Sequence, residues 1–154
     1  MIFWIAAIVV TALDQWTKSI VVGHMMPSES RIFIPHVVWW TYVQNTRGAF
    51  GLFGDQPLLL IGLAAVVLVL FYWAFRDLAA RSVVVRAAFG AIVGGAVGNV
   101  IDRVTRHFVV DFIDFRWWPV FNAADSFITI GVIVLIFTSL ARDRTPAASG
   151  GAPS

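Results

Sequence analysis

The sequence predicts an all-α integral membrane protein: a bundle of four transmembrane helices with a small extracytoplasmic β-element in its first outer loop. Of the 154 residues, 59% are hydrophobic and only 13% are charged, and the mean hydropathy is +0.83. Such values lie far above those of a water-soluble domain of this size. A bilayer core about 30 Å thick requires roughly 20 mostly apolar residues for each helical span, so the length allows about four spans joined by short loops.

Apolar segments of spanning length occur four times, and we expect helices at about 2–22, 58–75, 83–103 and 125–142. With the loops between them they form one membrane domain over residues 1–144. The first segment has no basic region before it and no small-residue cleavage site after it, so we interpret it as a retained helix. The last ten residues, 145–154, are rich in Pro, Ala, Ser and Gly, and we expect a disordered cytoplasmic tail.

The density of arginine predicts the orientation of the helices. One side of the bundle has five arginines in short non-membrane segments: Arg76, Arg81, Arg86, Arg142 and Arg144. The other side has the same number over a longer stretch of chain: Arg31, Arg47, Arg103, Arg106 and Arg116. The count alone does not decide between the two orientations. The higher density on the first side favours both termini in the cytoplasm.

The first outer loop, at about 23–57, is more than a linker. Residues 31–43 are rich in β-branched and aromatic side chains and are bounded by turn formers, which predicts a small β-element lying on the membrane. Aromatic residues in the two outer segments suit the interfacial belt of a membrane protein: Trp39, Trp40, Tyr42, Trp117 and Trp118.

Three glycines of the third helix, Gly90, Gly94 and Gly98, recur every four residues and therefore share one helix face. Small residues on one face let a neighbouring helix backbone approach closely. We interpret these glycines as packing residues and assign them no chemistry.

Polar residues of three helices are expected to meet in the outer half of the bundle. They are Asp14, about 18 Å along the first helix, Asn99, Asp102 and Arg103 at the end of the third, and Asn122 and Asp125 at the start of the fourth. Ionisable residues at such depth are costly, usually face the bundle interior, and indicate a functional site.

Each polar group also has a purely structural interpretation. Asp14 and Lys18 are four residues apart and can neutralise one another on a helix face. Asn122 followed by Asp125 is typical of a helix N-terminus, with Asn as the N-cap and an acid in the first turn. The polar residues that end the third helix can likewise form a hydrogen-bonded terminus.

Asp111 lies in a segment, residues 109–115, where acids alternate with large apolar residues, a pattern that a solvated loop does not need. Two carboxylates brought to one site are what an aspartic protease requires. One is ionised and takes a proton from water, and the other is protonated and polarises the scissile carbonyl, so the pair shares one proton. We expect Asp111 and Asp125 to be this pair, with Asp114 as the competing assignment.

Other kinds of chemistry have little support. The three histidines, His24, His36 and His107, lack zinc-ligand spacing, and the absence of cysteine rules out a thiolate nucleophile. The sequence has no serine-hydrolase elbow and no phosphate-binding glycine loop, so we expect neither a metal nor an organic cofactor. Scattered arginines and a net charge of +2 argue against a nucleic-acid partner.

Two functions from other classes stay open on these grounds. One is a non-enzymatic four-span protein, such as a transporter or a subunit of a complex, whose buried acids relay protons. The other is a membrane enzyme that hydrolyses lipid.

Five motif blocks occur in order over nearly the whole chain, at residues 14–18 (DQWTK), 45–51 (NTRGAFG), 94–103 (GGAVGNVIDR), 109–112 (VVDF) and 121–126 (FNAADS). At these residues the sequence closely resembles the lipoprotein signal peptidases of bacteria, the type II signal peptidases. It departs from the family pattern at Arg47, where the family usually has Gly, and Gly48 follows.

The resemblance implies an intramembrane aspartic endopeptidase that removes the signal peptide of diacylglyceryl-modified prolipoproteins, cleaving just before the lipidated cysteine. It implies a site facing outward from the bacterial cytoplasmic (inner) membrane, and we expect a monomer whose partners are prolipoproteins and lipid. The matching positions assign catalysis to Asp111 and Asp125, lining of the site and binding of substrate backbone to Asn45, Asn99, Arg103 and Asn122, and supporting roles to Asp14 and Asp102. Lys18 falls in the first block without an assigned role.

Overall fold

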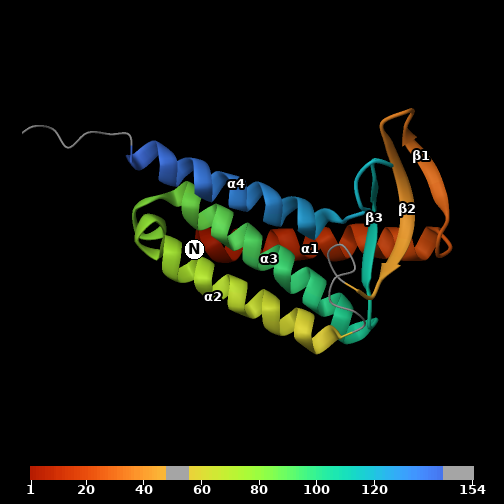
Figure 1. Ribbon diagram of the computed structural model, residues 1–154, viewed down its shortest axis with the longest axis horizontal. Helices are drawn as coiled ribbons and strands as arrows, with labels where there is room; N and C mark the ends of the chain where they lie inside the picture. The colour runs from red at the N-terminus through yellow and green to blue at the C-terminus, as the bar shows by residue number, and fades with distance from the viewer. Residues whose placement is uncertain (48–55, 144–154) are drawn as a thin grey trace, which may run out of the picture.

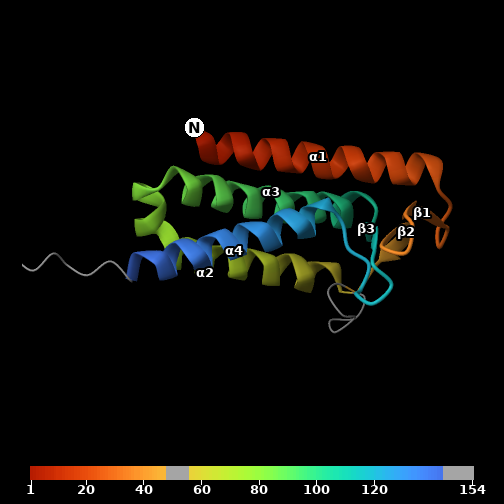
Figure 2. The ribbon, with the colours of Figure 1, turned by 90° about the horizontal axis from the view of Figure 1, so that it is seen from above.

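The computed structural model describes residues 1–47 and 56–143 and has the predicted four-helix membrane fold. The helices, each long and apolar enough to cross a membrane, are α1 (Ile2–His24), α2 (Pro57–Arg81), α3 (Val83–Thr105) and α4 (Ala123–Asp143). They run side by side, and a small sheet covers one end of the bundle (Figures 1 and 2). The predicted tail at 145–154, and Gly48 and Gly51 of the second motif block, lie outside the described residues.

Helix α2 continues well past residue 75, where the sequence predicted its end, and Ser82 alone separates it from α3. Arg76 and Arg81, which we expected in a loop, therefore lie in α2. The polar residues after position 75 mark where the apolar span ends, but Arg, Leu and Ala are strong helix formers and carry the helix further.

Two side chains secure this tight connection between α2 and α3. The Ser82 hydroxyl caps α3 by accepting a hydrogen bond from the backbone N–H of Val85 at 3.3 Å. The Arg86 guanidinium donates through Nη1 to the carbonyl oxygens of Ala79 and Ala80, at 2.8 and 3.1 Å, and so satisfies two carbonyls at the end of α2.

Helix α3 lies at the centre of the bundle because its glycines admit its neighbours. A side chain at Gly94 would collide with the backbone of Ala7 in α1, and one at Gly98 would collide with the Asp14 carboxylate. The predicted close approach of a neighbouring helix to this face is confirmed. Gly98 in addition leaves room for a charged group against the helix.

The sheet is antiparallel, with strand order β1-β2-β3. Its strands are β1 (Ser30–Ile34), β2 (Val38–Asn45) and β3 (Val109–Asp114). The predicted β-element corresponds to the β1-β2 hairpin, but we did not predict β3. All six residues of β3 are at least partly buried, so the strand lacks the alternation of apolar and exposed polar positions that identifies a half-buried strand.

The sheet is fixed to the end of α1 by an apolar core in which Tyr42, Val110 and Phe112 pack against Val21 and Met25. Burial of each large side chain contributes on the order of 1.5–3 kcal/mol. The prediction that Tyr42 lies in the membrane interface is wrong, because this ring is only 4% exposed. Successive strand residues point to opposite faces, and Tyr42 lies on the face that covers α1.

Adding a methyl group at the α1–α3 contact is expected to destabilise the bundle. Gly94→Ala forces the two backbones apart, and such overpacking costs about 1–3 kcal/mol. The matched control is Gly62→Ala in α2, where nothing lies within 4 Å of the added carbon. This control is expected to be neutral or to stabilise by up to about 1 kcal/mol through helix propensity. Thermal unfolding in detergent measures both, and equal stability of the two variants would contradict the packing role of Gly94.

Candidate active site

A buried lysine lies at the meeting point of α1, α3 and α4. Lys18 is fully buried, and its ammonium contacts Asp14 at 2.8 Å, Asp102 at 3.0 Å and the Asn99 Oδ1 at 2.8 Å. An ammonium has three N–H donors, and each has an acceptor here. A buried charge is tolerated only when it is paired and hydrogen-bonded in this way. The predicted neutralisation of Asp14 by Lys18 is confirmed.

The two acids that flank Lys18 connect it to other elements. Asp14 accepts a hydrogen bond from the backbone N–H of Ala124, at the start of α4, at 3.0 Å. Asp102 accepts one from the backbone N–H of Val110, in β3, at 3.0 Å and also pairs with Arg106. The cluster therefore fixes the ends of the helices and the sheet relative to one another.

Among the residues that the structure describes, Arg103 makes no ion pair with Asp102, the residue before it. Asp102 is held by Lys18 and Arg106 instead. Arg103 donates to the backbone carbonyl of Asn99 at 3.3 Å and lines the neighbouring cavity. Arg106, whose structural role we did not predict, lies four residues after Asp102 on the same helix face, and that spacing was the available signal.

The Asn99 amide has a fixed orientation. An ammonium only donates hydrogen bonds, so the Asn99 atom that faces Lys18 must be the oxygen. The amide nitrogen then points the other way and donates to Asp125 Oδ1 at 2.8 Å. The usual ambiguity of an asparagine flip is resolved here by the chemistry of its partners.

The Asn122 amide is fixed by a second constraint. Its oxygen caps α4 by accepting from the backbone N–H of Asp125 at 3.0 Å, as the sequence predicted. Its nitrogen must therefore face the opposite side, where it donates to Asp111 Oδ1 at 2.6 Å and to Asn99 Oδ1 at 3.1 Å. One residue is both the helix cap and the hydrogen-bond donor to Asp111.

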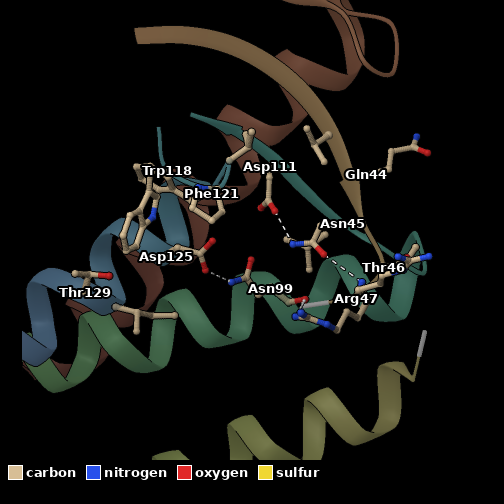
Figure 3. A pocket seen from close by; sticks show the side chains of 16 residues that line it. Gln44, Asn45, Thr46, Arg47, Asn99, Asp111, Trp118, Phe121, Asp125 and Thr129 are labelled. Atoms are coloured by element: carbon tan, nitrogen blue, oxygen red, sulfur yellow. Dashed lines mark hydrogen bonds between the residues drawn. The ribbon is translucent and has the colours of Figure 1, made fainter. Parts of the chain in front are cut away.

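Asp111 and Asp125 come from β3 and from the first turn of α4, and both line one cavity of about 790 Å³. Asp111 is 2% exposed and accepts a second hydrogen bond from the Asn45 amide nitrogen at 2.8 Å. In Figure 3 both carboxyl groups face the same cavity, that of Asp111 beside Asn45 and that of Asp125 beside Asn99. The structure thus brings together the two acids that the sequence placed in separate segments.

Burial raises the pKa of Asp111 to about 7, and the negative charge of Asp125 acts in the same direction. The hydrogen bonds from Asn45 and Asn122 and the positive charge of Lys18 oppose this rise in pKa without cancelling it. Near neutral pH, Asp111 therefore exchanges a proton readily, which suits a residue that holds a proton for catalysis.

Asp114, the competing assignment, lies outside this cavity. It accepts hydrogen bonds from the Thr41 hydroxyl and from the backbone N–H of Arg116, both at 2.7 Å. Its carboxylate therefore ties β2 to the turn that follows β3, which is a structural role.

The remaining predicted residues separate into two layers. Asn45, Asn99 and Arg103 line the cavity with the two acids. Asp14, Lys18, Asp102 and Asn122 lie behind it, fully buried. Sequence reasoning did not single out Thr129, which also lines the cavity. Its place four residues after Asp125 on α4 puts it on the same helix face.

Apolar side chains complete the cavity wall, chiefly Val43, Val109, Phe121 and Ile128. Such walls lower the local dielectric constant and strengthen the electrostatic effects described above. Among residues 1–47 and 56–143, no three His, Asp or Glu side chains are grouped in a way that suits a metal ion.

Fold and site together define a multi-pass membrane protein with a paired-carboxylate cavity at one end of its helix bundle. The family model described as "Signal peptidase (SPase) II" matches residues 6–141, and the chain belongs to this peptidase family. The organisms of its relatives are bacteria, so the protein is a bacterial membrane protein.

Relatives and solved structures resemble the chain over nearly its full length. The "Lipoprotein signal peptidase" of Syntrophomonas wolfei subsp. wolfei is 43% identical, with 91% of this chain and 93% of the relative covered. That of Moorella thermoacetica is 38% identical with the same coverage. A structure described as "Bacterial membrane enzyme structure by the in meso method at 2.3 A resolution" matches with a TM-score of 0.85 and 31% identity, covering 96% of this chain and 93% of its own.

Removal of the Lys18 charge is expected to unfold much of the bundle. Lys18→Met leaves Asp14 and Asp102 buried without their shared cation, and breaking a buried pair in this way costs about 3–5 kcal/mol. The control is Arg31→Met, which removes an exposed ion pair with Glu29 and an exposed hydrogen bond to the His24 carbonyl, and it is expected to cost about 1 kcal/mol. Thermal unfolding in detergent compares them, and a Lys18→Met variant as stable as Arg31→Met would rule out the central role of this cluster.

The raised pKa of Asp111 predicts a pH dependence of stability. Because its pKa is near 7 in the folded protein and near 3.8 when unfolded, the folded form binds the extra proton between these values. The contribution of Asp111 to the free energy of unfolding therefore falls as pH rises from about 4 through 7. Melting temperatures at pH 5 and pH 8 are expected to show a smaller decline in Asp111→Asn than in the parent protein or Asp114→Asn. If the melting temperature of Asp111→Asn falls between pH 5 and pH 8 as much as that of the parent protein, the raised pKa of Asp111 is refuted.

Proposed function

We propose that this protein is an intramembrane aspartic endopeptidase that removes signal peptides from diacylglyceryl-modified bacterial prolipoproteins, cleaving just before the lipidated cysteine. One observation carries the proposal: Asp111 and Asp125 line a single cavity, each held by an amide donor, in a member of the signal peptidase II family. The names of the relatives supply the substrate class.

The surroundings of the two acids support our assignment of their resting states. Asp111 is buried in β3 and has a raised pKa, so it holds the shared proton. Asp125 lies in the first turn of α4, where the positive end of the helix dipole and the Asn99 amide offset part of the cost of burying its charge, so we assign the ionised state to Asp125. The pair titrates as one unit, with a single proton between the two acids.

The proposed reaction follows from this division. Asp125 takes a proton from water, and the resulting hydroxide attacks the scissile carbonyl carbon while Asp111 gives its proton to the carbonyl oxygen. The tetrahedral intermediate then collapses: the C–N bond breaks, the leaving nitrogen receives a proton from Asp125, and the gem-diol proton returns to Asp111. One water is consumed, and the pair again holds one proton.

Two polar neighbours of the acid pair have distinct roles in the proposal. Arg103 lines the cavity one helical turn from Asn99, and its guanidinium is suited to hold a carbonyl oxygen of the substrate backbone. Asn45 donates to Asp111 and accepts from the backbone N–H of Arg47 at 3.1 Å, so its amide is already used within the protein. We assign Asn45 to the positioning of Asp111.

The arginine density favours both termini in the cytoplasm, which puts the cavity toward the outer face of the inner membrane in our proposal. Trp117 and Trp118, which are exposed beside the sheet, suit the outer interface. The substrate's signal helix then enters sideways from the lipid, with its acyl chains in the outer leaflet. One chain supplies every group of the proposed site, which supports a monomeric enzyme.

The test combines purified protein with diacylglyceryl-modified and unmodified prolipoprotein. Asp111→Asn and Asp125→Asn each remove one member of the acid pair and are expected to lower turnover at least 100-fold. Asp114→Asn, only three residues from Asp111, is the matched control and is expected to keep most activity. Released signal peptide is measured by mass spectrometry, and only the modified substrate is expected to be cleaved.

Substantial cleavage by either Asn variant would move the chemistry away from this pair. Proton-coupled transport in liposomes without peptide cleavage would instead favour a transporter, a function that a buried acid with a pKa near 7 also suits. Hydrolysis of phospholipid in the absence of lipoprotein would identify a lipid hydrolase.

A further inference from the structure

A second cavity lies at the end of the bundle away from the acid pair, between the start of α1, the end of α2 and the start of α3. We call it the aromatic cleft. Its volume is about 310 Å³, and five aromatic rings, one alanine and two arginines line it. None of its residues takes part in the proposed chemistry. A hollow of this size between helices is within the range of small-molecule sites, roughly 300–1,000 Å³.

The walls of the cleft are built around Phe89 of α3. Its ring lies 5.9 Å from the ring of Phe3 in α1 and 6.4 Å from the ring of Tyr72 in α2. Phe71 and Phe75 stack at 5.7 Å on the α2 side. Rings from all three helices therefore form one apolar surface, which suits a hydrocarbon chain.

Two guanidinium groups line the cleft, from different helices. Arg86 of α3 uses Nη1 to hold the carbonyls at the end of α2. Within the part of the chain that the structure describes, its other N–H donors have no partner and can bind a further acceptor. Arg76 of α2 lies with its guanidinium carbon 4.4 Å from the centre of the Trp73 ring. Stacking on a ring uses the face of a guanidinium and leaves its in-plane N–H donors available.

The electrostatic balance at the cleft is positive. The nearest acid to Arg76 is Asp77, whose carboxylate is 3.8 Å away and 86% exposed, too distant and too solvated to neutralise it fully. Arg81, at the end of α2, adds a third positive charge nearby. Arginine forks match phosphate oxygens in geometry, with two parallel N–H donors per group.

Helix α2 is the least buried of the four helices. Its most apolar stretch is 6% buried, compared with 44% for α3. Its middle and its end pack, through residues such as Leu68 and Phe75, against an apolar cluster that belongs mostly to α3. A ligand in the aromatic cleft would also join α2 to α1.

We propose that the aromatic cleft binds one anionic phospholipid, with its phosphate between Arg76 and Arg86 and an acyl chain against Phe3 and Phe89. The apolar rings of the cleft match an acyl chain, and the two arginines beside them match a phosphate group. Basic pockets between transmembrane helices are recognised sites for anionic headgroups. The proposal is independent of the peptidase reaction. Its structural consequence is that the lipid holds α2 against α1.

Native mass spectrometry of the delipidated full chain in detergent tests this site. Phosphatidylglycerol and phosphatidylcholine with identical acyl chains are titrated separately. We expect one phosphatidylglycerol per chain to bind at least fivefold more tightly than phosphatidylcholine, and millimolar inorganic phosphate not to displace it. Arg76→Gln is expected to remove most of this preference. Arg81→Gln, which removes the same charge outside the lining, is expected to keep it.

A second pair of variants tests the hydrocarbon slot. Ala79→Leu fills the cleft and is expected to weaken binding of both lipids, whereas Ala80→Leu, on the exposed neighbouring position, leaves binding unchanged. Melting temperatures of the lipid-free variants identify any that fail to fold. Among the described residues, Arg76 makes no hydrogen bond to the backbone, unlike Arg86, so Arg76→Gln is expected to fold normally. Equal binding of the two lipids, or equal losses in Arg76→Gln and Arg81→Gln, would overturn the proposal.

Discussion

The structure of the polar end depends on one buried ammonium group. Lys18 is the only lysine of the chain, and its ammonium contacts groups of α1 and α3 with no exposure to solvent. A cation in that position requires two acids and one amide oxygen around it, and each of those groups is also bound to another element. The constraint therefore extends outward from Lys18 to the start of α4 and to β3.

The same constraint reaches the carboxylate pair through hydrogen-bond direction. A lysine cannot accept, so Asn99 must turn its nitrogen to Asp125, and a helix cap must accept, so Asn122 must turn its nitrogen to Asp111. Donors that are already oriented cost no reorganisation when charge moves during a reaction. The pair is also made asymmetric by its supports, since one acid is buried in a sheet and the other lies at a helix N-terminus.

The two ends of the bundle place their polar groups differently relative to the surrounding lipid. At the sheet end, polar groups are collected inside, away from hydrocarbon, and close approach at Gly94 and Gly98 leaves room for them. At the other end, aromatic rings from three helices leave a slot, and the arginines lie beside it. Our lipid proposal and the peptidase proposal thus concern separate regions that share only α1 and α3.

The sequence by itself determined the four spans, the β-hairpin, the packing face of α3 and the candidate acids, because hydropathy, periodicity and motif spacing are local properties. It did not reveal β3, the helical course of residues 76–81 or the burial of Tyr42, because each depends on what packs against the segment. It paired Lys18 with Asp14 but did not reveal its contacts with Asp102 and Asn99, since these partners come from another helix. Only the tertiary structure decided which amide faces which acid, because hydrogen-bond direction is set by partners more than 20 residues apart, such as Asn99 and Asp125, or Lys18 and Asn99.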